Sequence, residues 1–421
     1  MKLLEKPPVF NIFDNDDSLK ERAKKITGRL KRRKDKALAG AAKKWGSSQW
    51  RLTRKDLKEA MRELSTPQFR ALELACKQTG GRSRKQLSSL KPFVYRPTPG
   101  WTITHSFKPL RSMALVLPSV PRLQTSPLIE FAVSAALAGI KERIVCISPE
   151  SKGDLLPLMM AAGFMTEVTG FYILPPEEAM AALSLNYTSV PVVDKILAFA
   201  DNNTAAMKTC LGQMSPTELV LTGASELIVL AEGQARSDLI ALELAAHRER
   251  HPFGTCGLIT PDKELLSGIK KILKSRFSES LKKAKEPFGR HCIYLLNTAN
   301  QEEAVGIANE RAPEHIWLLT SRPEEWESRL EAYGVLHIGP HAAEVLSEGG
   351  FGPSLAGDHG TAWRGMHSML DFLRSTVIEE VVPSAYKRLG KSTAILSNLE
   401  KRPLSAETAL TRIELKPWHE T

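Results

Sequence analysis

Residues 309–316 read Asn-Glu-Arg-Ala-Pro-Glu-His-Ile and stand between a helical pattern and a short apolar run. Apolar residues recur at helical spacing through positions 304–308, and Pro313 is expected to end that helix. Glu314 and His315 then fall in the turn that leads into a buried strand. An acid beside an imidazole can share proton transfer, because different environments separate their pKa values. The alternative is a solvated glutamate and a histidine bonded to the backbone.

Other segments of the chain stand in a fixed order around this stretch. Residues 190–196 read Val-Pro-Val-Val-Asp-Lys-Ile, residues 223–231 read Gly-Ala-Ser-Glu-Leu-Ile-Val-Leu-Ala, and Gly-Thr-Ala at 360–362 precedes Asp-Phe at 371–372. Together with Pro-Glu-His and its apolar run, they resemble segments of the histidinol dehydrogenases in the same order. The resemblance implies NAD-dependent oxidation of L-histidinol to L-histidine in histidine biosynthesis. It implies that Glu314 activates water and that His315 shuttles protons.

Length and composition set broad limits. With 421 residues, 42% of them hydrophobic, the chain can form two or three domains with sizeable cores. No apolar run is long enough for a membrane span, and the acidic N-terminus around Asp14–Asp17 lacks the apolar core of a signal peptide. The five cysteines are odd in number and show no Cys-x-x-Cys spacing, which favours free thiols. The expected compartment is the cytoplasm.

Basic residues are concentrated near the N-terminus. The formal net charge is +11, and much of the excess lies in Lys24-Lys25, Lys31–Lys34 and Lys43-Lys44. Such clusters can bind nucleic acid or anionic surfaces. They alternate with apolar residues at near-helical spacing, and no aromatic platform accompanies them. We therefore expect the exposed face of an amphipathic helix, and no nucleic-acid partner.

The order of apolar runs and helical patterns indicates the fold class. Strand and helix patterns alternate between Met113 and Phe171, as in βαβ units of a parallel sheet. The expected fold is α/β, with two Rossmann-like sheet domains of the aldehyde dehydrogenase and histidinol dehydrogenase type, a helical N-terminal region and a C-terminal arm. The expected boundaries are an extension at 1–17, a discontinuous first domain at 18–111 plus 232–376, a dinucleotide-binding-type domain at 112–231 and a dimerisation arm at 377–421. The resemblance implies a homodimer.

Local patterns add finer expectations about the elements. Residues 18–45 are expected to form one long helix, and a helix from Thr66 is expected to end before Gly80-Gly81. A strand at Leu227–Leu230 is expected to complete the 112–231 domain. Residues before Ser112 are expected to pack with those after Ala231, because the later strands need helical cover.

The resemblance assigns NAD-binding positions that differ chemically from those of the relatives. A pyrophosphate needs closely approaching backbone N–H groups, which glycines and helix N-termini provide. Relatives carry Pro-Gly-Gly after the first strand, whereas this chain continues from Pro118 without either glycine. Glu178 stands where relatives have glutamine, and Asp201 stands where they have small neutral residues. Asp201 would repel a phosphate, although an acid can instead hold a ribose hydroxyl.

The zinc positions implied by the resemblance are His247, Arg250, Glu348 and Glu407. A histidine and two carboxylates can bind a cation, but arginine stays protonated and has no lone pair to donate. One interpretation is a salt-bridged cluster in which Arg250 neutralises the two glutamates. The other is a rebuilt metal site in which His251 joins His247 at i, i+4 spacing.

The substrate-contacting positions implied by the resemblance are Ser225, Glu348 and Leu355, where Leu355 stands in place of a histidine. Two functions of different class therefore follow from the sequence. One is a working dehydrogenase that uses NAD and zinc. The other is a catalytically inactive paralogue that acts as a dimeric binding or scaffold protein.

Overall fold

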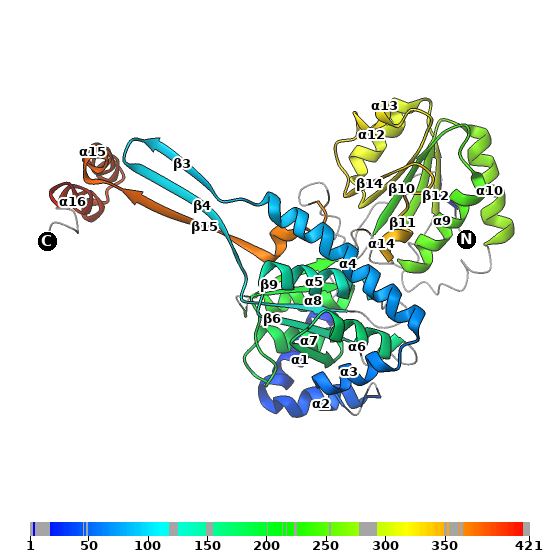
Figure 1. Ribbon diagram of the computed structural model, residues 1–421, viewed down its shortest axis with the longest axis horizontal. Helices are drawn as coiled ribbons and strands as arrows, with labels where there is room; N and C mark the ends of the chain where they lie inside the picture. Colours follow the sequence, from blue (N-terminus) through cyan, green and yellow to red (C-terminus); the bar gives the residue numbers. More distant parts are fainter. Residues whose placement is uncertain are drawn as a thin grey trace. The chain divides into compact units, whose positions relative to one another are not determined.

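The computed structural model describes residues 3–4, 17–44, 46–47, 49–117, 125–148, 155–199, 201–212, 214–215, 217–222, 225–251, 254–277, 293–348, 352, 361 and 365–415. They form an α/β fold with two parallel sheets and a smaller antiparallel one (Figure 1). The chain divides into two compact units, residues 1–84 with 110–372 and residues 85–109 with 373–421.

The first parallel sheet follows the predicted alternation of strands and helices. Its strand order is β2-β7-β6-β5-β8-β9, and only the edge strand β2 is antiparallel. The strands are β2 (Arg51–Leu52), β5 (Ser112–Val116), β6 (Glu142–Ile147), β7 (Gly170–Ile173), β8 (Lys195–Phe199) and β9 (Glu218–Thr222). The connecting helices are α5 (Thr125–Ala138), α6 (Leu155–Met165), α7 (Pro176–Ser184) and α8 (Asn202–Leu211).

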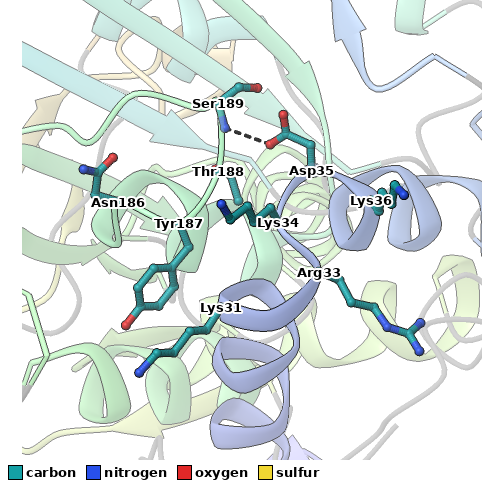
Figure 2. Close-up of a pocket in the computed structure, with 9 residues that line it drawn as sticks. All are labelled: Lys31, Arg33, Lys34, Asp35, Lys36, Asn186, Tyr187, Thr188 and Ser189. Atoms are coloured by element: carbon teal, nitrogen blue, oxygen red, sulfur yellow. Dashed lines mark hydrogen bonds between the residues drawn. The ribbon is translucent and has the colours of Figure 1, made fainter.

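The N-terminal helices pack against this first sheet. They are α1 (Asp17–Arg33), α2 (Asp35–Lys44), α3 (Arg54–Arg62) and α4 (Thr66–Ser89). The expectation of one helix over 18–45 is wrong, because Lys34 adopts a left-handed φ of 49° that separates α1 from α2 (Figure 2). Asp35 fixes this turn, since its carboxylate accepts the N–H of Ser189 at 2.7 Å.

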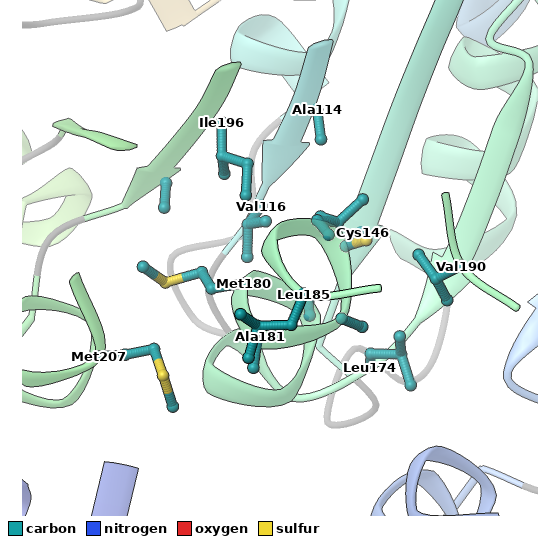
Figure 3. Close-up of a cluster of buried hydrophobic side chains, with 14 of the residues drawn as sticks. Ala114, Val116, Cys146, Leu174, Met180, Ala181, Leu185, Val190, Ile196 and Met207 are labelled. Carbon is teal, nitrogen blue, oxygen red and sulfur yellow. The ribbon is translucent and has the colours of Figure 1, made fainter. Parts of the chain in front are cut away.

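The core of the first sheet lies between its strands and the helices α1 and α7. Figure 3 shows Met180 and Ala181 of α7 packed beside Val116 of β5 and Ile196 of β8. Leu30 of α1 belongs to the same buried cluster. The expectation that residues before Ser112 pack with those after Ala231 is therefore wrong for α1. The apolar face of α1 is used to cover the first sheet.

Helix α4 continues through Gly80-Gly81, which were expected to follow its end. Two contacts with α5 hold its second half: Ser83 Oγ lies 2.9 Å from Ser134 Oγ, and Arg82 pairs with the buried Glu130 at 2.6 Å. Tertiary contacts therefore outweigh the low helix propensity of two glycines, which costs about 1 kcal/mol each relative to alanine.

The second parallel sheet has the strand order β1-β12-β11-β10-β13-β14. Its strands are β1 (Leu3–Leu4), β10 (Glu226–Ala231), β11 (Thr255–Thr260), β12 (Ile293–Asn297), β13 (His315–Leu319) and β14 (Val335–Ile338). Its helices are α9 (Ser237–Arg250), α10 (Lys263–Arg276), α12 (Gln301–Arg311), α13 (Pro323–Glu327) and α14 (Val345–Glu348). The assignment of Leu227–Leu230 to the 112–231 domain is wrong, because β10 pairs with β11 and β13. The N-terminal extension also contributes a strand, β1.

The second unit is built around an antiparallel sheet of order β15-β4-β3. Its elements are β3 (Phe93–Thr98), β4 (Trp101–Pro109), β15 (Leu373–Val381), α15 (Pro383–Leu399), α16 (Pro403–Thr411) and the 3-10 turn Arg412–Glu414. The expected arm at 377–421 thus begins earlier, at Leu373, and it incorporates the hairpin of β3 and β4. Among the described residues, no helix is both long and apolar enough to cross a membrane.

Candidate functional site

The stretch at 309–316 connects α12 to β13 as the sequence predicts. Helix α12 ends with Ala312 in the left-handed conformation, at φ 45°. Pro313 follows, and His315 is the first residue of β13. Glu314 and His315 are 1% and 4% exposed, which excludes the interpretation of Glu314 as a solvated side chain.

Glu314 is held by a buried ion pair next to it. Its Oε2 accepts the backbone N–H of Glu226 at 2.8 Å. The Glu226 carboxylate in turn accepts the Arg311 Nε–H at 3.0 Å and the Tyr294 hydroxyl at 3.1 Å. Burial raises the pKa of Glu226, and Arg311 opposes that rise. Arg311 therefore holds Glu226, at the start of β10, in place. The backbone N–H of Glu226 in turn binds the Glu314 carboxylate.

His315 faces two other titratable side chains. Its Nδ1 lies 3.1 Å from His337 Nε2, and its Nε2 lies 3.9 Å from Glu344 Oε1. Burial lowers the pKa of His315 to about 3, against the attraction of Glu344. The imidazole is therefore neutral near pH 7, with a nitrogen that can accept a proton.

Glu344, which precedes α14, lies at the centre of a buried polar cluster that also contains His247, Arg250, His251 and His315. It is 2% exposed. Its Oε2 lies 2.7 Å from His247 Nδ1 and accepts the Arg250 Nη2–H at 2.9 Å, while its Oε1 lies 3.0 Å from His251 Nε2. Burial raises the pKa of Glu344, but its partners, His247 first among them, more than offset this and keep the pKa well below its usual value. The carboxylate is therefore ionised.

Arg250 bridges two buried carboxylates. Its guanidinium contacts Glu344 at 2.9 Å and Glu243 at 2.8 Å, and the three side chains are at most 10% exposed. The sequence predicted a cluster of this kind, but with Glu348 and Glu407. Those pairings stay predictions: the Glu348 side chain lies outside the described residues, and Glu407 is an exposed residue of the second unit.

Sequence reasoning missed Glu243, His337 and Glu344. Only indirect signals pointed to them. A buried arginine requires a counter-charge, and Glu243 stands two helical turns before Arg250. Glu344 and His337 come from other segments, and their approach depends on the pairing of β13 with β14 and on the turn that follows.

The resemblance implies a zinc ion held by His247, Arg250, Glu348 and Glu407. The implied set does not fit, because Arg250 cannot donate a lone pair and is already engaged by Glu243 and Glu344. A different set is closer: ligand atoms of His247, His251 and Glu344 lie within 4.8 Å of one another. Arg250 holds Oε2 of Glu344, whereas Oε1 lies 3.0 Å from His251 Nε2, so a cation bound there would share this carboxylate with the Arg250 guanidinium.

Ser225, an implied substrate contact, lies beside this cluster. Its carbonyl oxygen is 3.2 Å from His247 Nε2, and its own hydroxyl is buried with no hydrogen bond among the described residues. Gly254 permits this approach, because a Cβ there would lie 2.3 Å from the Ser225 oxygen. Leu355, the other implied contact, lies outside the described residues.

The NAD positions that the structure describes are occupied by internal contacts. The Asp201 carboxylate caps α8 by accepting the Thr204 N–H at 2.8 Å. Glu178 is bound by Arg29 of α1, and the neighbouring Glu177 is bound by Arg22 at 2.7 Å. These residues do not fit a pyrophosphate, because a carboxylate already caps this helix N-terminus. Pro118 lies outside the described residues.

The described residues thus combine an α/β fold of two largely parallel sheets with a buried polar cluster around Glu344. The profile of the family described as histidinol dehydrogenase matches residues 13–413. The chain belongs to the histidinol dehydrogenase family.

Relatives agree with this assignment along nearly the whole chain. The histidinol dehydrogenase of Pseudomonas syringae pv. syringae is 27% identical over 417 residues, covering 96% of this chain and 91% of the relative. That of Nitrosomonas europaea is 27% identical over 374 residues, covering 86% and 84%. The crystal structure of histidinol dehydrogenase from Elizabethkingia anophelis matches with a TM-score of 0.85, at 18% identity, covering 98% of this chain and 95% of that one. At that identity the structural match shows the fold alone.

Replacing Arg250 by alanine is expected to destabilise the protein strongly. The change leaves two buried carboxylates without their shared counter-charge, which typically costs about 3–5 kcal/mol. Denaturant unfolding of Arg250→Ala measures the loss. Arg322→Ala is the control, because Arg322 forms an exposed pair with Glu325 and its loss should cost less than about 1 kcal/mol. Equal and small losses in both variants would contradict the buried bridge.

The lowered pKa of His315 predicts a pH dependence of stability. The unfolded histidine binds a proton below pH 6.5, whereas the folded one binds it only near pH 3. Between these values the unfolded state holds more protons, so each unit of falling pH removes about 1.4 kcal/mol of stability. The free energy of unfolding from pH 7 to pH 5 should fall less steeply in His315→Gln than in the unchanged protein. Parallel curves would show that His315 does not titrate in this way.

Proposed function

We propose that this family member no longer carries out the NAD- and zinc-dependent oxidation of L-histidinol and acts as a dimeric binding protein. The observation that carries the proposal is the bridge from Arg250 to Glu243 and Glu344. It stands where the resemblance places a zinc ligand. A permanently charged guanidinium supplies there the positive charge that a metal would bring.

The dinucleotide side of the first sheet gives independent support. An incoming pyrophosphate would meet the Asp201 carboxylate on the N-terminus of α8. It would also approach Glu177 and Glu178, which are acidic and mostly buried. A pyrophosphate requires positive charge or free N–H groups, whereas Asp201, Glu177 and Glu178 are acidic. The nearby cations, Arg22 and Arg29, are already paired with Glu177 and Glu178.

A working dehydrogenase is the second candidate, and the buried Glu314-His315 pair favours it. Glu314 is oriented by the N–H of Glu226, and His315 is neutral near pH 7. An oriented carboxylate is suited to activating water. The neutral imidazole has a lone pair for the proton of an alcohol, and its pKa of about 3 makes it a weak base for that step. These are the roles that the resemblance implies for the two residues.

Zinc content and NADH formation separate the two candidates. Incubation of the purified protein with L-histidinol and NAD is expected to give no NADH above that of Glu314→Gln, and elemental analysis is expected to find much less than one zinc per chain. Glu310→Gln, an exposed change of the same charge, is the control. Turnover that falls about a hundredfold or more only in Glu314→Gln would instead establish the dehydrogenase.

We also propose that the second unit forms the interface of a homodimer. Its surface exposes many large apolar side chains, which soluble monomers rarely gather in one place. They include Val377, Ile378, Ile395, Leu396, Leu399 and Leu404, each at least 54% exposed. Burial against a second copy would remove this surface from water.

Charges placed on this surface should abolish the dimer. Light scattering after size exclusion is expected to show a dimer for the unchanged protein and a monomer for the double variant Leu399→Glu/Leu404→Glu, because two buried carboxylates would be unpaired. Leu74→Glu is the control, since Leu74 is exposed on α4, outside the second unit. A monomeric unchanged protein would refute the interface.

A further inference from the structure

A basic cavity on the first unit lies apart from the polar cluster around Glu344. Its volume is about 490 Å³, within the range of small-molecule sites. It is lined by Lys31, Arg33, Lys34, Asp35, Lys36, Asn186, Tyr187, Thr188 and Ser189. The lining therefore combines the end of α1 and the start of α2 with the loop that follows α7.

The topology separates this cavity from the edge of the first sheet at which the resemblance implies NAD binding. Helix α7 begins after the carboxyl end of β7 and returns toward the edge where β8 starts, so the loop at 186–189 lies at the amino ends of the strands. Ligands of the doubly wound fold bind at the opposite edge, outside the carboxyl ends. The cavity thus belongs to neither the implied NAD site nor the Glu314-His315 site.

The charges of the cavity are unbalanced. Four of its residues are cationic and one is acidic. None of the four cations forms an ion pair within the part of the chain that the structure describes. The acid, Asp35, is already bound to the N–H of Ser189 at 2.7 Å. This contact also ties the α1–α2 turn to the loop. In Figure 2 the side chains of Lys31 and Lys34 extend on the side of the loop, whereas those of Arg33 and Lys36 extend away from it.

The side chains supply more than charge. In Figure 2, Lys31 and Tyr187 extend toward the same side, and the Lys34 side chain lies toward Thr188. Tyr187, Thr188 and Asn186 add hydroxyl and amide groups to the same lining. Phosphate oxygens accept hydrogen bonds from ammonium, hydroxyl and amide groups.

We propose that this cavity binds a small molecule bearing two adjacent phosphate groups. The two ammonium groups of Lys31 and Lys34 contact the phosphates, and the loop at 186–189 supplies neutral hydrogen bonds. The volume exceeds what a single phosphate fills, and the concave shape favours a compact molecule over a nucleic-acid duplex. The sequence alone favoured an exposed helix face for these lysines, and the loop at 186–189, which lines the cavity with them, changes that interpretation.

Calorimetric titration with inorganic pyrophosphate tests the proposal. Saturable binding with one site per chain is expected, and the double variant Lys31→Gln/Lys34→Gln should weaken it about tenfold or more, because hydrogen bonds to charged groups are lost. Lys43→Gln/Lys44→Gln is the matched control, with the same charge change at the far end of α2. Circular dichroism checks that both variants fold.

Three outcomes would overturn the site. Equal weakening by both double variants would indicate diffuse attraction to a basic surface. Absence of pyrophosphate binding at about 0.1 M salt, where only interactions within about 10 Å persist, would do the same. Binding of a single-stranded oligonucleotide in the absence of pyrophosphate binding would assign the surface to nucleic acid. None of these results depends on zinc content or NADH formation.

Discussion

The buried carboxylate of Glu344 holds together the side chains of the polar cluster, His247, Arg250 and His251. An ion in such a place costs several kcal/mol in lost hydration unless partners compensate for it. Helix α9 supplies the compensation from one face near its end, because His247, Arg250 and His251 stand at i, i+3 and i+4. The last turn of a helix also favours a cation, which places Arg250 well. The end of α9 and the turn before α14 are therefore joined by charge.

A second buried pair performs a similar task at the start of β13. Glu226 pairs with Arg311 and accepts the Tyr294 hydroxyl, and the backbone N–H of Glu226 orients Glu314. The conformation of the Glu314-His315 pair thus depends on residues from β10, α12 and β12. This explains why the arginine of the 309–316 stretch matters to the fold itself, whatever chemistry the acid and the imidazole perform.

The sequence predicted the parts of this architecture that depend on local pattern. The helix before Pro313, the strand after it and the βαβ units of the first sheet follow from spacing and apolar runs. The break at Lys34 could not be predicted, because the tether from Asp35 to Ser189 joins distant segments. The sheet to which β10 belongs was wrong for a related reason: strand pairing depends on partners far along the chain. Glu344 was missed because its partners meet only in the folded protein.

The two altered ligand positions follow one physical pattern. Where the resemblance implies a metal, Arg250 now neutralises the local carboxylates, and where it implies a pyrophosphate, Asp201 now caps the helix. Each substitution replaces an external charge with one from the chain. A fold arranged in this way does not need its ligands to offset buried charge or unpaired N–H groups. Replacing Arg250 alone would therefore remove a structural counter-ion from Glu243 and Glu344 before any metal could take its place.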